Sequence, residues 1–331
     1  DGLLDAGAFY LRNIAFFVLP FLAGYFAWKR RLGRAARLRL ALAFAAAAAA
    51  INAFPFAAGG HTQLLAALHL PIALWLVVGI AYAGGRWADG SRRMDFVRFS
   101  GELFIYYVLM ALGGGVLTGV TLATFAAIGV DAEPFAQQWM LPCGAMGAVV
   151  IGAWLVEARQ GVVESMAPVL TRLFTPMFAA TMLAVLATML WNGSGIDAER
   201  EALIGFDLLL AVVLGLLLYA VSARDVQARP GLFDGLQLLL VVCALVLDAV
   251  ALSAIAGRIS EFGLSPNRMA ALGENLLLLV NLARSAWLYA KFLAGRGAFS
   301  ALERWQTAYL PAYAVWAAFV VVAFPPLFGF A

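Results

Sequence analysis

The chain has 331 residues, of which 64% are hydrophobic and only 12% charged, and its net charge is +3. A soluble domain carries about 45–50% apolar and about 25% charged residues, so this composition excludes an ordinary soluble domain. Two cysteines and two histidines are too few for a disulfide framework or a zinc cluster. We therefore expect no metal, no other cofactor and no nucleic-acid partner.

The apolar residues are divided into blocks close to the 20 or so residues that cross a hydrocarbon core. These blocks predict an all-α, polytopic transmembrane helix bundle of about ten spans, forming a single domain over residues 1–331. Because the chain does not begin with Met, this domain can be part of a longer protein. The predicted spans are 9–28, 38–56, 64–84, 103–130, 137–156, 173–191, 203–222, 235–256, 267–290 and 308–329.

The basic residues alternate between the two sides of this bundle. With ten spans, one side receives eighteen of the 22 Lys and Arg residues, and the other side receives Arg12, Arg200, Arg258 and Arg268. Cytoplasmic loops are enriched in Lys and Arg, so the first side is predicted to face the cytoplasm. Both termini then lie outside, and we expect a multi-pass protein of the bacterial inner membrane.

The first basic loop runs from Lys29 to Arg39 and contains six Lys and Arg residues. We interpret it as a topology anchor whose positive charge also contacts anionic lipid headgroups. The lipid bilayer is therefore the one partner that composition and charge predict directly.

The stretch "GRISEFGLSPNRMAALGENL", residues 257–276, is unusually polar for this chain. It begins in the predicted outer loop between the eighth and ninth spans and runs into the ninth. Gly263 can supply a turn. Ser265 and Pro266 form a helix-start signal, because Ser caps free N–H groups and Pro suits the first helical position. The ninth helix is therefore predicted to begin near Pro266.

Asn267, Glu274 and Asn281 follow at intervals of seven residues along this helix, and Ser285 continues the line four residues later. Seven residues make nearly two turns, so these side chains share one face. An ionisable side chain that faces lipid costs several kcal/mol, so the face is predicted to point into the bundle.

Asp248 is the one charged residue of the predicted eighth span, at a depth similar to that of Glu274. Two carboxylates placed so on adjacent helices could share a proton, bind a cation or pair with Arg258 or Arg268 from the loop. We expect at least one arginine–carboxylate contact between this loop and the eighth or ninth span. A purely structural role, in which these polar groups lock helices together, is the alternative.

His61 lies in a predicted outer loop, and His69 lies eight residues later on the third span. They share roughly one helical face about 12 Å apart, too far for one metal ion. We expect His69 to be a buried, hydrogen-bonded side chain. His61 could carry protons for an outward-facing site.

The segment "RISEFGLSPNRMAALGENLLLLVNL" resembles a signature of uncharacterised bacterial multi-pass membrane proteins, the domain of unknown function 4153 type. A related group shows the pattern E-x-Y-G-L-T-x-x-R. Its counterparts here, with Phe for Tyr and Ser for Thr, are Glu261, Phe262, Gly263, Leu264, Ser265 and Arg268. The segment "LRNIAFFVLPFLAGYF" is similar to the first span of that family. The resemblance implies a bacterial inner-membrane location and brings no established activity.

Two main hypotheses for function follow, and they belong to different classes. The first is a permease-like or ligand-binding protein for a small molecule or lipid, with an outward-facing polar site between the eighth and ninth spans. The residues assigned to it are Asp248, Arg258, Glu261, Asn267, Arg268, Glu274, Asn275 and Asn281. The second is an enzyme acting at the periplasmic face on an envelope or lipid-linked substrate. Glu261 or Glu274 would then serve as general base, and Arg258 and Arg268 would hold an anionic group such as a phosphate. A structural membrane scaffold is the third possibility.

Overall fold

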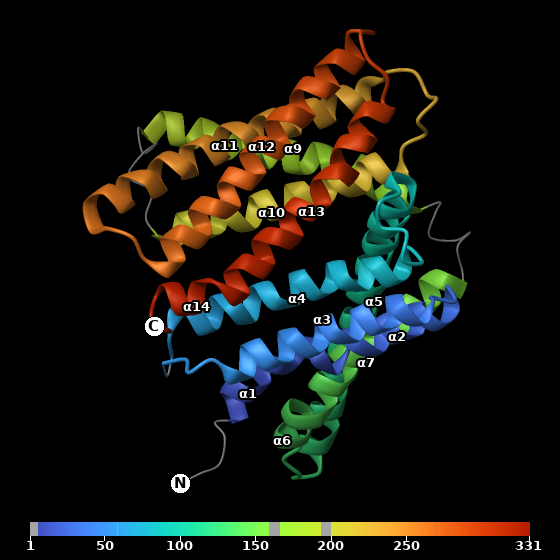
Figure 1. Ribbon diagram of the computed structural model, residues 1–331, viewed down its shortest axis with the longest axis vertical. Helices are drawn as coiled ribbons and strands as arrows, with labels where there is room; N and C mark the ends of the chain where they lie inside the picture. Colours follow the sequence, from blue (N-terminus) through green and yellow to red (C-terminus); the bar gives the residue numbers. More distant parts are fainter. Residues whose placement is uncertain (1–5, 58, 159–165, 193–199) are drawn as a thin grey trace.

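The structure is a computed structural model that describes residues 6–57, 59–158, 166–192 and 200–331. The described residues fold into helices without a strand (Figure 1). The first elements are α1 (Ala6–Asn13), the 3-10 helix η1 (Ile14–Phe17), α2 (Leu19–Lys29), α3 (Arg34–Ala53), α4 (His61–Tyr82) and α5 (Gly90–Ala127). There follow α6 (Glu133–Phe135), the π-helix η2 (Ala136–Met140), α7 (Leu141–Ala158) and α9 (Met166–Asn192). The last are α10 (Arg200–Ala223), α11 (Leu232–Phe262), α12 (Pro266–Leu293), α13 (Ser300–Val322) and α14 (Phe324–Leu327).

Ten helical segments among the described residues are long and apolar enough to cross a membrane, and each overlaps one predicted span. The predicted fold class is therefore confirmed, and the architecture is that of a multi-pass membrane protein. The largest difference is in α5, which begins at Gly90 instead of residue 103. Its first turns are too polar for a hydropathy criterion to detect, yet Asp89 caps them by accepting a hydrogen bond from the Ser91 amide.

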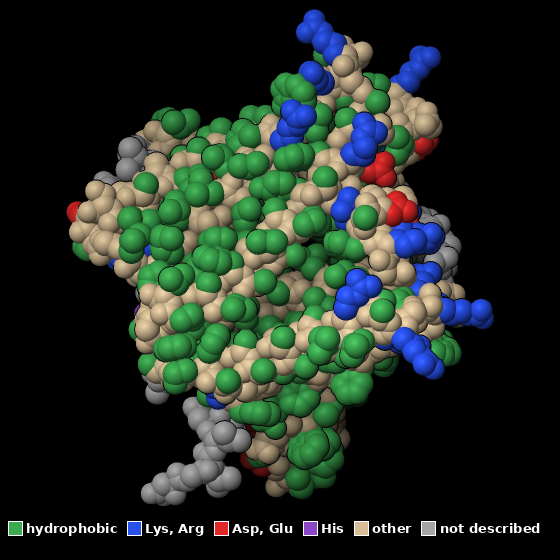
Figure 2. Space-filling model, viewed as in Figure 1, with side chains coloured by type: hydrophobic (Ala, Val, Ile, Leu, Met, Phe, Trp, Pro, Cys, Tyr) green, Lys and Arg blue, Asp and Glu red, His purple; other side chains and the backbone are tan. Residues whose placement is uncertain are grey.

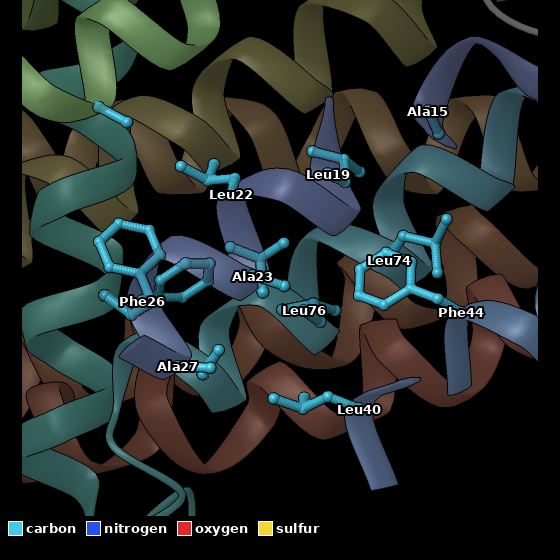
Figure 3. Close-up of a cluster of buried hydrophobic side chains, with 14 of the residues drawn as sticks. Ala15, Leu19, Leu22, Ala23, Phe26, Ala27, Leu40, Phe44, Leu74 and Leu76 are labelled. Carbon is cyan, nitrogen blue, oxygen red and sulfur yellow. The ribbon is translucent and has the colours of Figure 1, made fainter. Parts of the chain in front are cut away.

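Two hydrophobic cores organise the bundle. The first joins α2, α3 and α4 with parts of α5 and α7, and Figure 3 shows part of it. Phe26 is fully buried there and makes edge-to-face contacts with Phe99 and Tyr82. The second core joins α9, α10, α11, α12 and α13 around side chains such as Leu217, Leu247 and Leu282, and α5 adds to both cores. The chain therefore forms two helix groups, drawn mainly from the two halves of the sequence.

The two groups meet where α4 lies against α12 and α13 (Figure 1). Ala270 of α12 and Val320 of α13 pack there with Phe324 of α14, and Leu65 of α4 lies against them. The backbone amide of Thr62 donates to the carbonyl of Ala331 at 2.8 Å, which holds the α14 segment beside the start of α4. Helix α4 thus brings the first half of the chain into contact with the polar face of α12.

Lys and Arg side chains gather along one side of the molecule in Figure 2. We call this side the basic end; the start of α5 and the α2–α3, α10–α11 and α12–α13 turns lie there. Glu157, whose side chain is 3% exposed, binds Lys29 at 2.6 Å and Arg30 at 3.0 Å, and Arg224 binds Asp234 at 2.7 Å. These ion pairs hold neighbouring helices together at the basic end. The starts of α4, α10 and α12 lie at the opposite end of the molecule (Figure 1).

Candidate functional site

The polar segment between α11 and α12 folds as its sequence predicts. Helix α11 ends at Phe262, and Gly263 follows with a φ of 73°, a left-handed conformation that favours glycine. Helix α12 begins at Pro266, and the hydroxyl of Ser265 accepts a hydrogen bond from the backbone amide of Arg268 at 3.4 Å. The predicted start of this helix is therefore confirmed.

Arg268 does not make the predicted contact with a carboxylate. Its Nη1 donates to the carbonyls of Phe262 and Gly263, at 3.1 Å and 2.8 Å, and its guanidinium lies 5.5 Å from the centre of the Phe262 ring. The arginine therefore satisfies carbonyls left unpaired at the end of α11. Arg258 is partly buried in the last turns of α11, and Glu261 is exposed beside them.

The polar face of α12 forms two side-chain contacts with α4. Near the start of both helices, Asn267 Nδ2 donates to His61 Nδ1 at 3.1 Å. Two turns deeper, Glu274 Oε1 lies 2.7 Å from His69 Nε2, and His69 is buried, as its position on an apolar helix predicted. The inward direction of this face is therefore confirmed for both residues. That the partners are the two histidines of α4 was not predicted.

Asn275, the next residue, faces a different set of helices because consecutive helical residues point about 100° apart. Its side chain is fully buried, and Nδ2 donates to Asp207 Oδ1 of α10 and to the carbonyl of Ala271, both at 2.9 Å. Asn275 thus connects α12 to α10, whereas Glu274 connects it to α4.

Asp248 on α11 is fully buried and interacts electrostatically with Asp207, which also interacts with Glu274. One turn away, Leu203 of α10 packs against Ala251 and Ala254 of α11, which brings these helices together. The predicted proton sharing between Asp248 and Glu274 is not found, because Glu274 turns toward α4 and bonds to His69.

Asp207 was not predicted to be a site residue, although its sequence signal matches that of Asp248. It is the one charged residue of the predicted seventh span, residues 203–222. A single ionisable residue inside an apolar span is the signal common to both aspartates, since intramembrane ionisable residues commonly mark functional positions.

Three buried oxygens in this region lack a hydrogen-bond partner among the described residues. They are both carboxylate oxygens of Asp248 and the amide Oδ1 of Asn275. An unpaired buried polar group costs roughly 1–3 kcal/mol, and a charged one costs more. We call Asp207, Asp248 and Asn275 the open acceptor site, because its unpaired atoms are all acceptors.

Asn281, the third residue of the polar face, belongs to a different arrangement. Its side chain exchanges hydrogen bonds with Gln306 of α13, each at 3.1 Å, and its Oδ1 also accepts from the Ser285 hydroxyl at 3.1 Å. Gln306 Nε2 donates to Ser285 Oγ at 2.7 Å. Asn281, Ser285 and Gln306 are all fully buried, and we call them the closed network. Asn281 therefore hydrogen-bonds to the tenth span.

Among the described residues, no group of three or more His, Cys, Asp or Glu side chains is placed to hold a metal ion. The arrangement instead offers acceptors in the bundle interior, next to a histidine–carboxylate pair. Such a site suits a proton, or a small cation that can contact several oxygens.

Comparisons of the chain with protein-family models, with curated proteins and with solved structures give no match. The resemblance of residues 261–268 to the domain of unknown function 4153 type therefore stays a prediction.

Proposed function

We infer that the protein is a permease-like membrane protein that binds a small monovalent cation at the open acceptor site. The observation that carries this proposal is the group of three buried, unpaired oxygens on Asp248 and Asn275. An aspartate at the centre of a membrane helix costs about 2.5–3.5 kcal/mol. A bound cation would offset this cost.

The chemistry of the site favours a cation over an anion. Asp207 and Asp248 have acceptor-only side chains when ionised, and the amide nitrogen of Asn275 already donates to Asp207. A proton can bridge two of these oxygens at most, whereas a small cation can contact several. Carboxylate and amide oxygens suit hard cations, such as alkali ions, and protonated primary amines.

The enzyme hypothesis has less support. It requires arginines placed to hold an anionic group, but Arg268 donates to two carbonyls at the end of α11. The proposed general bases are also separated, because Glu261 is exposed at that end whereas Glu274 bonds to His69. The scaffold hypothesis explains the closed network well, but it gives no reason for unpaired carboxylate oxygens.

The proposal is tested by cation-dependent thermal unfolding of the purified protein in lipid nanodiscs. Sodium and methylammonium are compared with N-methylglucamine, a cation too bulky for a buried site, at constant ionic strength. We expect sodium or methylammonium to raise the Tm of the wild type, because a ligand that binds only the folded state stabilises it. A rise in Tm with sodium alone would indicate an alkali-ion site, and a rise with methylammonium alone would indicate an amine site.

Asp248→Asn is the decisive variant. It keeps the shape of the side chain, removes the charge and adds a donor that can bond to neighbouring acceptors. We expect its Tm without cation to equal or exceed that of the wild type, and its response to cation to disappear. Gln227→Ala is the control. Gln227 is exposed in the α10–α11 turn at the basic end, so its loss should leave the Tm response to cation unchanged. No response to either cation in the wild type would refute the proposal.

Orientation is a separate part of the proposal. We propose that the basic end faces the cytoplasm of a bacterial cell, with Arg31, Arg34, Arg37 and Arg39, all exposed, contacting anionic lipid. In a background without Cys143 and Cys243, a membrane-impermeant thiol reagent should label Leu264→Cys in intact cells but not Gly33→Cys. The reverse pattern would place the open acceptor site nearer the cytoplasm.

A further inference from the structure

The contact between His69 and Glu274 determines how many protons the two side chains hold. His69 Nδ1 lies 2.9 Å from the carbonyl oxygen of Leu65, one turn earlier on α4. A carbonyl oxygen can only accept, so Nδ1 carries a proton and donates it. In a neutral imidazole the other nitrogen, Nε2, is then unprotonated.

Nε2 nevertheless lies 2.7 Å from Glu274 Oε1, a distance typical of a charge-assisted hydrogen bond. Two bare lone pairs at this distance would repel each other, so one proton must lie between the two atoms. It belongs either to an imidazolium beside a carboxylate or to a carboxylic acid beside a neutral imidazole. In both forms the pair has zero net charge, and loss of that proton leaves one negative charge.

The surroundings connect this proton to the open acceptor site. Asp207 of α10 interacts electrostatically with Glu274 and with Asp248 of α11. On α4, His61 bonds to Asn267 two turns away. Helix α13 contributes Tyr309, which donates to the carbonyl of Leu277, and Tyr313; its Glu303 and Arg304 lie in its first turns, toward the basic end. Asp207, which bonds to Asn275 beside Glu274, therefore carries the negative charge that acts on the pair, and Asp248 acts on Asp207.

The pair also lies where the two helix groups meet. His69 belongs to α4 of the first group, and Glu274 belongs to α12 of the second. Without the shared proton, Nε2 and the carboxylate repel each other, and this hydrogen bond between the groups is lost. The Glu274 side chain is 38% exposed, so the pair lies at the surface of the bundle and not in its closed interior.

From this geometry we propose that the His69–Glu274 pair is a proton-binding site that is coupled to cation binding at the open acceptor site. This inference rests on the proposed function. A cation at the aspartates neutralises the charge that keeps the proton on the pair. The proton then leaves for water, the carboxylate and a neutral imidazole remain, and the contact between α4 and α12 opens. By linkage, protonation of the pair weakens cation binding to the same degree.

The coupling is tested by counting protons. Purified protein in a weakly buffered solution with a pH indicator is titrated with the cation that stabilises the wild type. The key variant is Glu274→Gln. Its amide can donate to Nε2 and so keep the contact, but it has no carboxyl group that can share a titratable proton. We expect the variant still to respond to cation, with a smaller rise in Tm than the wild type, and to release about one proton fewer per bound cation. Gln227→Ala, at the basic end, should release as many protons as the wild type.

The state of His69 is tested without any cation. The chain has two histidines, so His61→Gln leaves a single one, and [15N]histidine labelling then reports on His69 alone. We expect a protonated Nδ1 and a strongly hydrogen-bonded Nε2, and a changed Nε2 signal in the His61→Gln, Glu274→Gln double variant. An unprotonated Nδ1, or an Nε2 signal that does not respond to Glu274→Gln, overturns the assignment of the proton.

The two proposals fail in different ways. If the wild type binds cation but releases no proton, or if Glu274→Gln releases as many protons as the wild type, the coupling is wrong and the cation site stands. If no cation stabilises the wild type, the proposed function is wrong and the coupling fails with it. The nitrogen spectrum then still decides whether the pair holds a proton.

Discussion

The closed network and the open acceptor site are two polar groups on the same buried helix with opposite hydrogen-bond balance. Asn275 and Asn281, both fully buried, lie six residues and about 9 Å apart along α12. The side chain of Asn281 is paired with Gln306 and Ser285, whereas Oδ1 of Asn275 has no partner among the described residues. The same residue type in the same helix is therefore compatible with two different roles.

The residue types around each asparagine explain the difference. The closed network consists of amides and a hydroxyl, which both donate and accept, so they can satisfy one another without a ligand. The open acceptor site adds two aspartates, whose ionised side chains only accept. Polar groups that complete their own hydrogen bonds stabilise helix contacts, whereas acceptors without donors require something from outside the chain.

The largest expected effect comes from breaking the closed network. Gln306→Leu leaves the polar atoms of Asn281 with fewer partners in the bundle interior. We expect a loss of about 2–3 kcal/mol in unfolding free energy, measured by thermal or denaturant unfolding in lipid or detergent. The Tm response to cation should persist, because the open acceptor site is untouched.

Thr307→Val is the matched control for this variant. Thr307 is also buried, but its hydroxyl bonds to carbonyls of its own helix, at Glu303 and Arg304. Its loss should change stability little. Equal destabilisation by both variants would contradict a special role for the closed network.

A second variant tests the packing that places both groups. A Cβ at Gly273 of α12 would collide with the Trp316 ring of α13. We expect Gly273→Ala to cost about 1–2 kcal/mol through overpacking and to disturb Glu274 and Asn275 beside it. Gly257→Ala in α11, where a Cβ meets open space, should be neutral or stabilising in the same unfolding assay. A neutral Gly273→Ala would show that α12 and α13 pack less closely there.

A third variant tests the open acceptor site from the asparagine side. Asn275→Leu removes the hydrogen bond to Asp207, which lowers stability, and the unpaired buried oxygen, which raises it. The two effects on the unfolding free energy partly cancel. We expect a stability change of about 1 kcal/mol or less, below that of Gln306→Leu, together with a clear loss of the cation response. A stability loss as large as that of Gln306→Leu, with the cation response intact, would make Asn275 a structural residue.

The smallest expected effect is at the outer contact between α4 and α12. The His61–Asn267 hydrogen bond lies near the helix starts, where His61 is exposed and water can replace its partner. We expect Asn267→Ala to change the unfolding free energy by about 0.5 kcal/mol or less. Cation binding and proton release should stay as in the wild type, and a loss of either would extend the site to the helix mouth.

The sequence by itself determined the elements and several of their directions. Hydropathy located the ten spans, because each apolar block must be long enough to cross the bilayer. Ser265 and Pro266 located the start of α12 through local backbone chemistry, and the seven-residue spacing determined which side chains share its polar face. These properties depend on residues close together in the chain, so a single sequence contains them.

Only the tertiary structure decided which helices that face meets. Glu274 lies 205 positions from His69 in sequence and contacts α4, not the α11 helix that carries Asp248. Asn281 turns to α13, and Arg268 bonds to the end of α11 instead of a carboxylate. Helical periodicity gives the direction of a side chain around its own axis, but the neighbour it meets depends on how ten similar apolar helices pack together.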